Sequence, residues 1–232
     1  MHDLPLSNRY RLQRAIMRLP GLVAYYPLNE AEGSVARNYA PATRGSLDGT
    51  ITGATVGQPG KAGRAYSFDG VNDVVNTNND YDFSGTKNFT IFLVMRYLTQ
   101  VNSFPRIVSK SRTIPTPDYV RFLVFSSTNT LDAGRTINNV GKSASVVLTP
   151  NTDYFCALTY NGTNSRLYLN GATPTVGPSD TEAFSSFASN IAICAEVGGN
   201  SPFTGLAQHF ALFDRALTDT ECLKLAQIAG LA

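Results

Sequence analysis

Carboxylates spaced for catalysis are scarce in this chain. Glycoside hydrolysis needs two carboxyl groups about 5 to 9.5 Å apart, one on each side of the scissile bond. Among the five glutamates, only Glu30 and Glu32 are close neighbours in the sequence, and they lie in a glycine-containing turn. This placement predicts solvated turn residues rather than a catalytic pair.

Histidine and cysteine offer little more. A Ser-His-Asp triad needs a poised histidine, but the chain has only His2, near its start, and His209, in a predicted strand where we expect a structural role. Cys156, Cys194 and Cys222 are scattered and give no zinc spacing, so we expect free buried thiols, with a disulfide as the alternative. We therefore predict that the protein is not an enzyme and requires no cofactor.

The composition favours one globular, strand-rich domain. The 232 residues are 43% hydrophobic and only 16% charged, with 19 Gly and 12 Pro. A net charge of +2 argues against general nucleic-acid binding, and we expect no nucleic-acid partner. No apolar run reaches the ~20 residues of a membrane helix, so no membrane insertion is expected.

An amphipathic helix is predicted over residues 6–19, with Ser7 as its N-cap and Pro20-Gly21 at its end. It carries an apolar stripe and basic residues, which we predict to be partner-attachment residues: Leu12, Ile16 and Leu19, with Arg9, Arg11, Arg14 and Arg18. Attachment to a partner subunit or to a second copy is the favoured interpretation. Packing on its own domain, and a calmodulin-like or membrane-surface role, are the alternatives.

From residue 22 onward the hydrophobic period changes to two. About a dozen short runs rich in β-branched and aromatic residues are separated by Gly, Asn, Asp or Pro, which predicts an all-β fold. A second helix is expected over about 219–228, with Thr218 as N-cap and Glu221 at the capping-box position. The predicted organisation is an attachment segment, 1–21, followed by one β domain, 22–232.

Several stretches, taken in order, resemble the laminin-G-like branch of the concanavalin A-like lectin/glucanase superfamily. They are LVAYYPLNEAEGS, GSLDGTITGATVGQPGKAGRAYSFDGVNDVVNT, NFTIFLVMRY, TDYFCALTYNGTNSRLYLNGA and FTGLAQHFALFDRALTDTEC. The resemblance implies a two-sheet antiparallel jelly-roll sandwich, to which a short N-terminal and a short C-terminal helix are added.

Local patterns agree with that fold. Asn170-Gly171 favours a type I′ turn, and Gly70 supplies a position where positive φ costs little. In residues 89–95, apolar side chains occur at both odd and even positions. This strand is therefore expected to be covered on both faces or to pack on another subunit.

The resemblance also implies a structural calcium ion, because family members often bind one through acids of the "FDG" turn and of the last strand. The first group is present as Asp69, with Asn72 and Asp73 nearby. The second is replaced by Ala207, Gln208 and His209. A calcium site at Asp69, Asn72 and Asp73 is therefore one expectation, and simple turn capping is the other.

Carbohydrate binding is the best-known role in this superfamily, and it relies on aromatic platforms. The chain has no Trp, and Tyr26 stands where relatives commonly carry Trp. Eleven Tyr remain, but their positions predict no particular sugar site.

Two functions remain open. The first is a non-enzymatic structural or decorating protein of a bacteriophage or other viral particle, located on the virion surface and bound to other virion proteins or to copies of itself. The alternative is an extracellular, lectin-like module that binds a cell-surface glycan. The basic residues at the start precede no apolar segment that would make a secretory leader, which favours the first function because lysis would release the protein.

Overall fold

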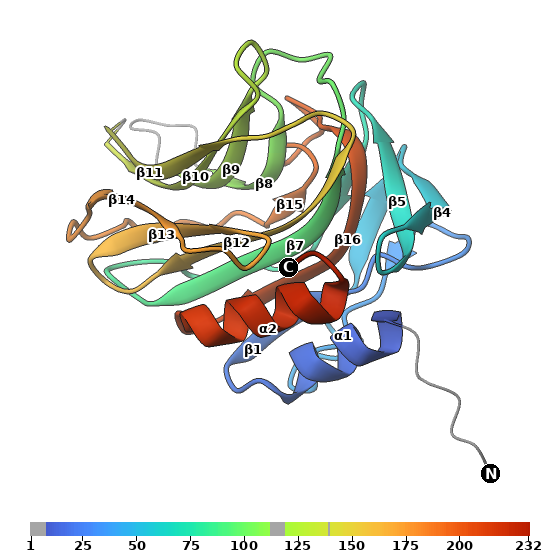
Figure 1. Cartoon of the computed structure of the whole chain (residues 1–232), viewed down its shortest axis with the longest axis horizontal. Coiled ribbons are helices and arrows are strands. Elements are labelled where there is room, and N and C mark those ends of the chain that lie inside the picture. The colour runs from blue at the N-terminus through green and yellow to red at the C-terminus, as the bar shows by residue number, and fades with distance from the viewer. Residues whose placement is uncertain (1–7, 112–118, 139) are drawn as a thin grey trace.

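The structure, a computed structural model, describes residues 8–111, 119–138 and 140–232, and within these it omits the side chains of Asn8, Arg9 and Leu123. It is a sandwich of two antiparallel sheets, with two helices beneath one of them (Figure 1). This confirms the predicted all-β jelly roll with a helix at each end.

Sheet A has eight strands among the described residues. Its order is β14 (Thr175–Ser179), β13 (Asn164–Leu169), β12 (Thr152–Tyr160), β7 (Phe89–Tyr97), β16 (Thr204–Phe213), β5 (Gly63–Asp69) and β4 (Thr55–Gly60), and β1 (Leu22–Tyr26) also pairs with β16. A bulge at His209, where φ is 53°, divides β16 so that its first part pairs with β5 and its second part with β1.

Sheet B also has eight strands in the described part of the chain. Its order is β11 (Val140–Val147), β10 (Thr130–Ile137), β9 (Tyr119–Phe125), β8 (Arg106–Ser111), β15 (Ala192–Ile193), β6 (Val74–Asn76), β3 (Gly49–Thr52) and β2 (Val35–Ala36). In β9 the buried residues alternate with partly exposed ones, as expected for a strand with one face against the core, whereas β10 is buried from Ala133 to Ile137.

The main hydrophobic core lies between the sheets. Strand β7 contributes Leu93 and Met95 to it, and β9 contributes Val120 and Phe122. All four side chains are at most 1% exposed. Burial of each such side chain stabilises the fold by about 1.5 to 3 kcal/mol.

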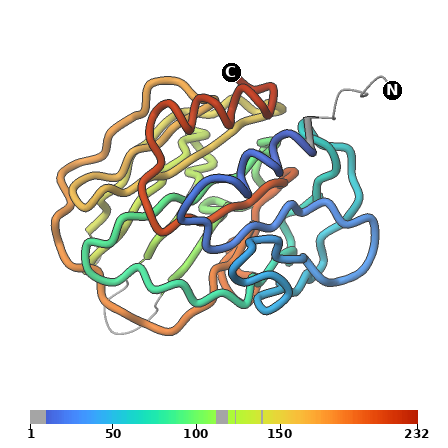
Figure 2. Tube along the Cα trace, turned by 90° about the horizontal axis from the view of Figure 1, so that it is seen from below, coloured from blue at the N-terminus to red at the C-terminus, as the bar shows by residue number. Residues whose placement is uncertain are grey.

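A second hydrophobic core lies on the other face of sheet A, under α1 (Asn8–Arg18) and α2 (Asp219–Ala229). Phe92 and Val94 of β7 point to this side and are fully buried, which confirms that this strand is covered on both faces. Helices of the same chain provide the cover. Figure 2 shows α1 and α2 side by side across this face, and the two helices are in contact.

The ends of the helices follow the sequence signals. Helix α2 has the predicted capping box, in which the Thr218 side chain accepts a hydrogen bond from Glu221 N and the Glu221 side chain accepts one from Thr218 N. Gly230, with φ of 74°, ends the helix. Helix α1 ends at Arg18, before Pro20-Gly21, and its predicted cap Ser7 lies outside the described residues.

Asn170 and Gly171 have φ of 52° and 70°, the positive values that a type I′ turn requires. The strands on either side are nevertheless joined by a longer connection, because β13 ends at Leu169 and β14 begins at Thr175. A Cβ on Gly171 would lie 2.9 Å from Leu223 Cα, so this turn packs tightly against α2.

Candidate functional site

The apolar stripe of α1 is directed to the domain itself. Leu12 and Ile16 are fully buried in the second core, beside Phe92, Phe213 and Leu225. The expectation that Leu12 and Ile16 contact a partner is therefore corrected, because sheet A already covers them. Since the helix and the sheet share one core, the boundary predicted at residue 21 does not separate two packing units.

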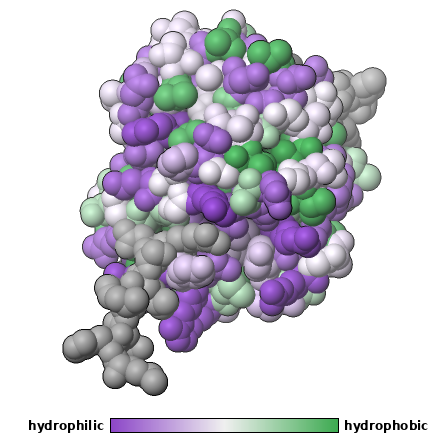
Figure 3. Space-filling view, turned by 90° about the vertical axis from the view of Figure 1, so that its right-hand side faces the viewer, coloured by the Kyte–Doolittle hydropathy of each residue, from purple (hydrophilic) through white to green (hydrophobic). Residues whose placement is uncertain are grey.

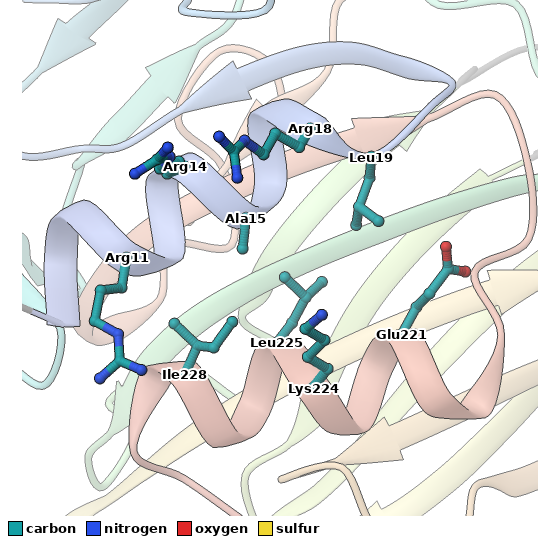
Figure 4. Close-up of a pocket in the computed structure, with 9 residues that line it drawn as sticks. All are labelled: Arg11, Arg14, Ala15, Arg18, Leu19, Glu221, Lys224, Leu225 and Ile228. Carbon is teal, nitrogen blue, oxygen red and sulfur yellow. The ribbon is translucent and has the colours of Figure 1, made fainter.

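The basic residues of α1 have a different environment. Arg11, Arg14 and Arg18 are exposed and line a groove of about 490 Å³ between α1 and α2 (Figure 4). Lys224 of α2 is exposed on the opposite wall. The side chain of Arg9, the remaining predicted attachment residue, lies outside the described residues.

The groove has an apolar floor. Ala15, Leu19, Leu225 and Ile228 line it and point into the space between the helices (Figure 4). Leu19 is the one member of the predicted apolar stripe that stays partly exposed. The groove can therefore bury apolar groups while its rim attracts negative charge.

Glu221 is the acid that lines this groove, and it is already paired. Arg215 donates two hydrogen bonds to its carboxylate, of 2.7 and 2.9 Å, and these lower the pKa of Glu221 to about 2. Arg215 also donates to Pro20 O, which ties the end of α1 to the start of α2. Glu221 is thus a structural residue, and the unpaired charge of the groove is positive.

A second candidate surface is the outer face of sheet B, formed by the residues of β8 to β11 that point away from the core. Because Val120, Phe122 and Val124 enter the core, Tyr119, Arg121 and Phe125 must face outward. Asp132 occupies the equivalent outward position on β10.

Polar groups on this outer face lie close together. The Arg121 guanidinium lies 5.3 Å from the centroid of the Tyr119 ring, and Arg106 Nε donates to Glu196 Oε1 at 2.9 Å. Burial lowers the pKa of Arg121, and the charge of Arg106 lowers it further. Four buried polar atoms on this face have no hydrogen-bond partner among the described residues: Arg106 Nη1, Arg121 Nε, Asp132 Oδ1 and Ser143 Oγ.

An aromatic pair lies at the end of β9. Phe104 and Phe125 pack edge to face with their ring centroids 5.7 Å apart, and Phe104 is 52% exposed. Phe125 is four residues from Arg121, or about 13 Å along the strand. The pair and the polar groups therefore form one elongated surface. This surface was not predicted from the sequence, although the alternate positions of Tyr119, Arg121 and Phe125 along one predicted strand were a signal for it.

The turn predicted to bind calcium is held by its own side chains. Asp73 Oδ2 accepts a hydrogen bond from Asp69 N, and Asp69 Oδ1 accepts one from Val71 N, both at 2.8 Å. Asp73 is 4% exposed, and burial raises its pKa, as does the neighbouring Asp69 carboxylate. Asn72 is exposed.

These groups fit a calcium ion poorly. Calcium takes about six to eight oxygen ligands, whereas the turn offers two carboxylates that already cap N–H groups. Gln208 and His209, which stand where family members carry the second group of acids, form hydrogen bonds with the backbone of Ala62. Among the described residues there is no group of three or more His, Cys, Asp or Glu placed to hold a metal. The calcium site stays a prediction.

The other residues considered for chemistry have structural contacts. Glu30 accepts hydrogen bonds from Arg37 N, Asn29 N and the Tyr66 hydroxyl. His209 is fully buried, and its Nδ1 lies 2.7 Å from the Tyr25 hydroxyl, in agreement with the expected structural role. The three cysteines are free and buried, as predicted.

On the side where β4 and β5 lie, the described apolar side chains form small patches separated by polar ones (Figure 3). No described helix has the length and apolar character needed to cross a membrane.

Comparison with protein families gives one match. The model of the concanavalin A-like lectin/glucanases superfamily named Laminin_G_3 matches residues 69–222. No significant match was found among curated protein sequences.

Solved structures show the same fold at low sequence identity. Trypanosoma rangeli sialidase in complex with the inhibitor DANA has a TM-score of 0.67 and 14% identity over 90% of this chain, which spans only 33% of that sialidase chain. Domain 4 of AbnA, an extracellular arabinanase from Geobacillus stearothermophilus, in complex with arabinotriose, has a TM-score of 0.63 and 16% identity over 89% of this chain and 98% of that domain. The binding domain of botulinum neurotoxin serotype G has a TM-score of 0.61 and 14% identity over 89% of this chain and 51% of that chain.

Proposed function

Because the chain belongs to the concanavalin A-like lectin/glucanases superfamily, we propose that it is a non-catalytic carbohydrate-binding domain that binds glycans on the outer face of sheet B. The observation that carries the proposal is the surface formed by the Phe104–Phe125 pair, in which Phe104 is 52% exposed, and by the partly exposed side chains of Arg121 and Asp132. An aromatic ring can stack on the apolar face of a sugar, while charged groups form strong hydrogen bonds with its hydroxyls.

The role of each residue follows from its position. Phe125, supported by Phe104, supplies the stacking platform. Arg121, held over Tyr119, donates to sugar oxygens, and Asp132 accepts from sugar hydroxyls.

Domain 4 of AbnA supports this proposal because it has nearly the same extent as this chain and is described in complex with arabinotriose. The proposal that the domain is not catalytic rests on the contacts of its own residues. Glu30 is engaged in three hydrogen bonds, and His209 is enclosed in the fold.

The test is binding of the full chain to a glycan panel, with Arg121→Ala and Phe125→Ala as variants. Arg14→Ala is the matched control because it removes an exposed arginine on the helix side. We expect both sheet B variants to lose binding by about tenfold or more while the control keeps it. Binding that is unaffected by both variants would overturn this site, and release of sugar from the panel would overturn the non-catalytic assignment.

A second function is favoured by the unpaired cations of the helix groove. In this function the domain is a decorating or structural component of a larger particle, such as a bacteriophage virion, and attaches through α1 and α2. Sheet B then faces outward, because its binding surface lies on the opposite side of the sandwich from the helices (Figure 1). Co-sedimentation of the protein with particles from a lysate of its host tests this function, and recovery of the protein only in the particle-free fraction would contradict it.

A further inference from the structure

We propose that the groove between α1 and α2 binds an acidic amphipathic helix of a partner protein. This inference gives the partner chemistry for the attachment function proposed above and does not depend on glycan binding by sheet B. It rests on the unpaired charge of the rim, the spacing of that charge and the apolar floor.

The charge of the rim has no ion-pair partner among the residues that the structure describes. Nine ion pairs join other charged residues of the described chain. None of them includes Arg11, Arg14, Arg18 or Lys224, and these four side chains make no hydrogen bond with a described residue. The two acids of the first turn of α2, Asp219 and Glu221, are taken by Arg166 and Arg215. Within the described part of the chain, the groove is therefore a cluster of four cations without a partner, beside carboxylates that are already paired.

The spacing of the arginines suits a helix. Arg11, Arg14 and Arg18 lie at positions i, i+3 and i+7, so they rise about 4.5 and then 6 Å along α1. Carboxylates at i, i+3 and i+7 of a second helix, laid along the groove, have the same rise. Arginine binds carboxylates with paired hydrogen bonds, so this match is directional as well as electrostatic.

The apolar floor of the groove is the reason why the partner helix should also carry apolar side chains. Leu19, Leu225 and Ile228 leave room for side chains to enter between the two helices, and the groove of about 490 Å³ holds a few of them. A third helix that packs on α1 and α2 would bury Leu or Ile residues there, in the manner of helix-in-groove recognition. A peptide with apolar residues next to its carboxylates therefore fits better than a purely acidic segment.

The experiment uses the full chain and a synthetic peptide of about 15 residues, roughly four helical turns. The peptide carries Glu at i, i+3 and i+7 beside a Leu stripe, and a matched peptide carries Lys in place of Glu. The groove variant is Arg14→Glu with Lys224→Glu. The control variant is Lys61→Glu with Arg64→Glu, which changes the net charge equally at exposed positions in and beside the β4–β5 turn. Thermal unfolding establishes that both variants remain folded.

We expect the acidic peptide to bind the wild-type chain and the control variant with the same affinity. Its affinity for the groove variant should be about tenfold lower. Binding to the wild-type chain should also be weaker at about 500 mM than at about 50 mM salt. Three outcomes would overturn the proposal. They are equal binding of the Lys peptide, loss of binding in the control variant but not in the groove variant, and binding to phosphatidylserine vesicles in place of the peptide. Concentration-dependent dimerisation that the groove variant abolishes, without peptide binding, would assign the groove to a second copy instead. Glycan binding is measured on the same samples, so failure of the groove and failure of sheet B are distinguishable.

Discussion

Sheets A and B share the core between them, but their outer faces differ. The outer face of sheet A is apolar and is covered by α1 and α2, whereas the outer face of β8 to β11 is polar and lies opposite the helices. The difference appears in β7 and β9. In β7, Phe92 and Val94 face the helices, whereas Arg121 and Phe125 are the outward residues of β9.

This contrast separates stability from binding. Where helices of the same chain cover the apolar residues of a face, that face contributes to the stability of the fold. A face with partly exposed polar and aromatic side chains is available to a ligand. On the covered side, the groove between α1 and α2, with its charged rim and apolar floor, remains open for recognition.

The largest expected effect comes from removing the cover. Deletion of residues 1–19 would remove Leu12 and Ile16 from the second core and expose to water the part of that core that α1 covers, so we expect loss of the cooperative folded state and aggregation. Circular dichroism and size-exclusion chromatography measure this effect. Deletion of residues 1–7, which precede α1, is the control and should leave the domain folded. A soluble, cooperatively unfolding domain without residues 1–19 would show that α1 is an accessory arm.

A single substitution makes the same comparison with less disruption. Phe92→Ala leaves a cavity in the second core and should lower the free energy of unfolding by about 3 to 5 kcal/mol. Phe125→Ala, on the outer face of sheet B, should lower it by less than about 1 kcal/mol. Denaturant unfolding of both variants provides the measurement. Equal losses would mean that the outer face of sheet B is as important to stability as the helix-covered face.

A third prediction concerns the contact between the 170–174 turn and α2. Gly171→Ala forces a side chain into a backbone with φ of 70° and places its Cβ 2.9 Å from Leu223 Cα. We expect a loss of about 1 to 3 kcal/mol in stability, seen as a lower melting temperature. Gly198→Ala is the control, because φ there is also positive, at 91°, but no atom lies within 4 Å of the added Cβ. If both variants lose the same stability, the effect comes from backbone conformation rather than from packing on α2.

The smallest expected effect is on pH dependence. Because Arg215 holds the pKa of Glu221 near 2 in the folded state, below its ordinary value of 4.5, the ionised carboxylate stabilises the fold above about pH 4.5. That contribution is lost as the pH falls from about 4.5 toward 2. Glu221→Gln should therefore be less stable than the wild-type chain near neutral pH, and the difference should narrow as the pH falls.

Denaturant unfolding at a series of pH values measures this narrowing. Arg215→Gln should show the same trend, because it removes the partner that lowers the pKa of Glu221. A difference between Glu221→Gln and the wild-type chain that stays constant from neutral to acidic pH would contradict the assignment.

Much of the fold could be predicted because its signals are local. The alternation in β9, the apolar residues at odd and even positions of β7, and the capping box at Thr218 and Glu221 each depend on residues only a few positions apart. Gly70, with φ of 83°, also has the backbone conformation expected of it. The family resemblance then ordered these elements into a jelly roll.

The surfaces were harder to predict because they join distant parts of the chain. Arg14 and Lys224 line one groove although they are far apart in the sequence, and nothing in either segment refers to the other. The partner of the fully buried Arg135 was hard to predict for the same reason. It occupies an inward position of β10, and Asp180, also fully buried, binds its guanidinium through two hydrogen bonds.

The sequence by itself therefore determined the elements: a helix with an apolar and a basic stripe, the strands of an antiparallel sandwich and a capped closing helix. These follow from periodicity and turn chemistry, which act over a few residues. Only the tertiary structure decided what covers the apolar stripe of α1, because Leu12 and Ile16 would be satisfied by any apolar surface. Their own sheet A, always present at high local concentration, covers them before a partner can, and the arginines of the same helix are left at the surface.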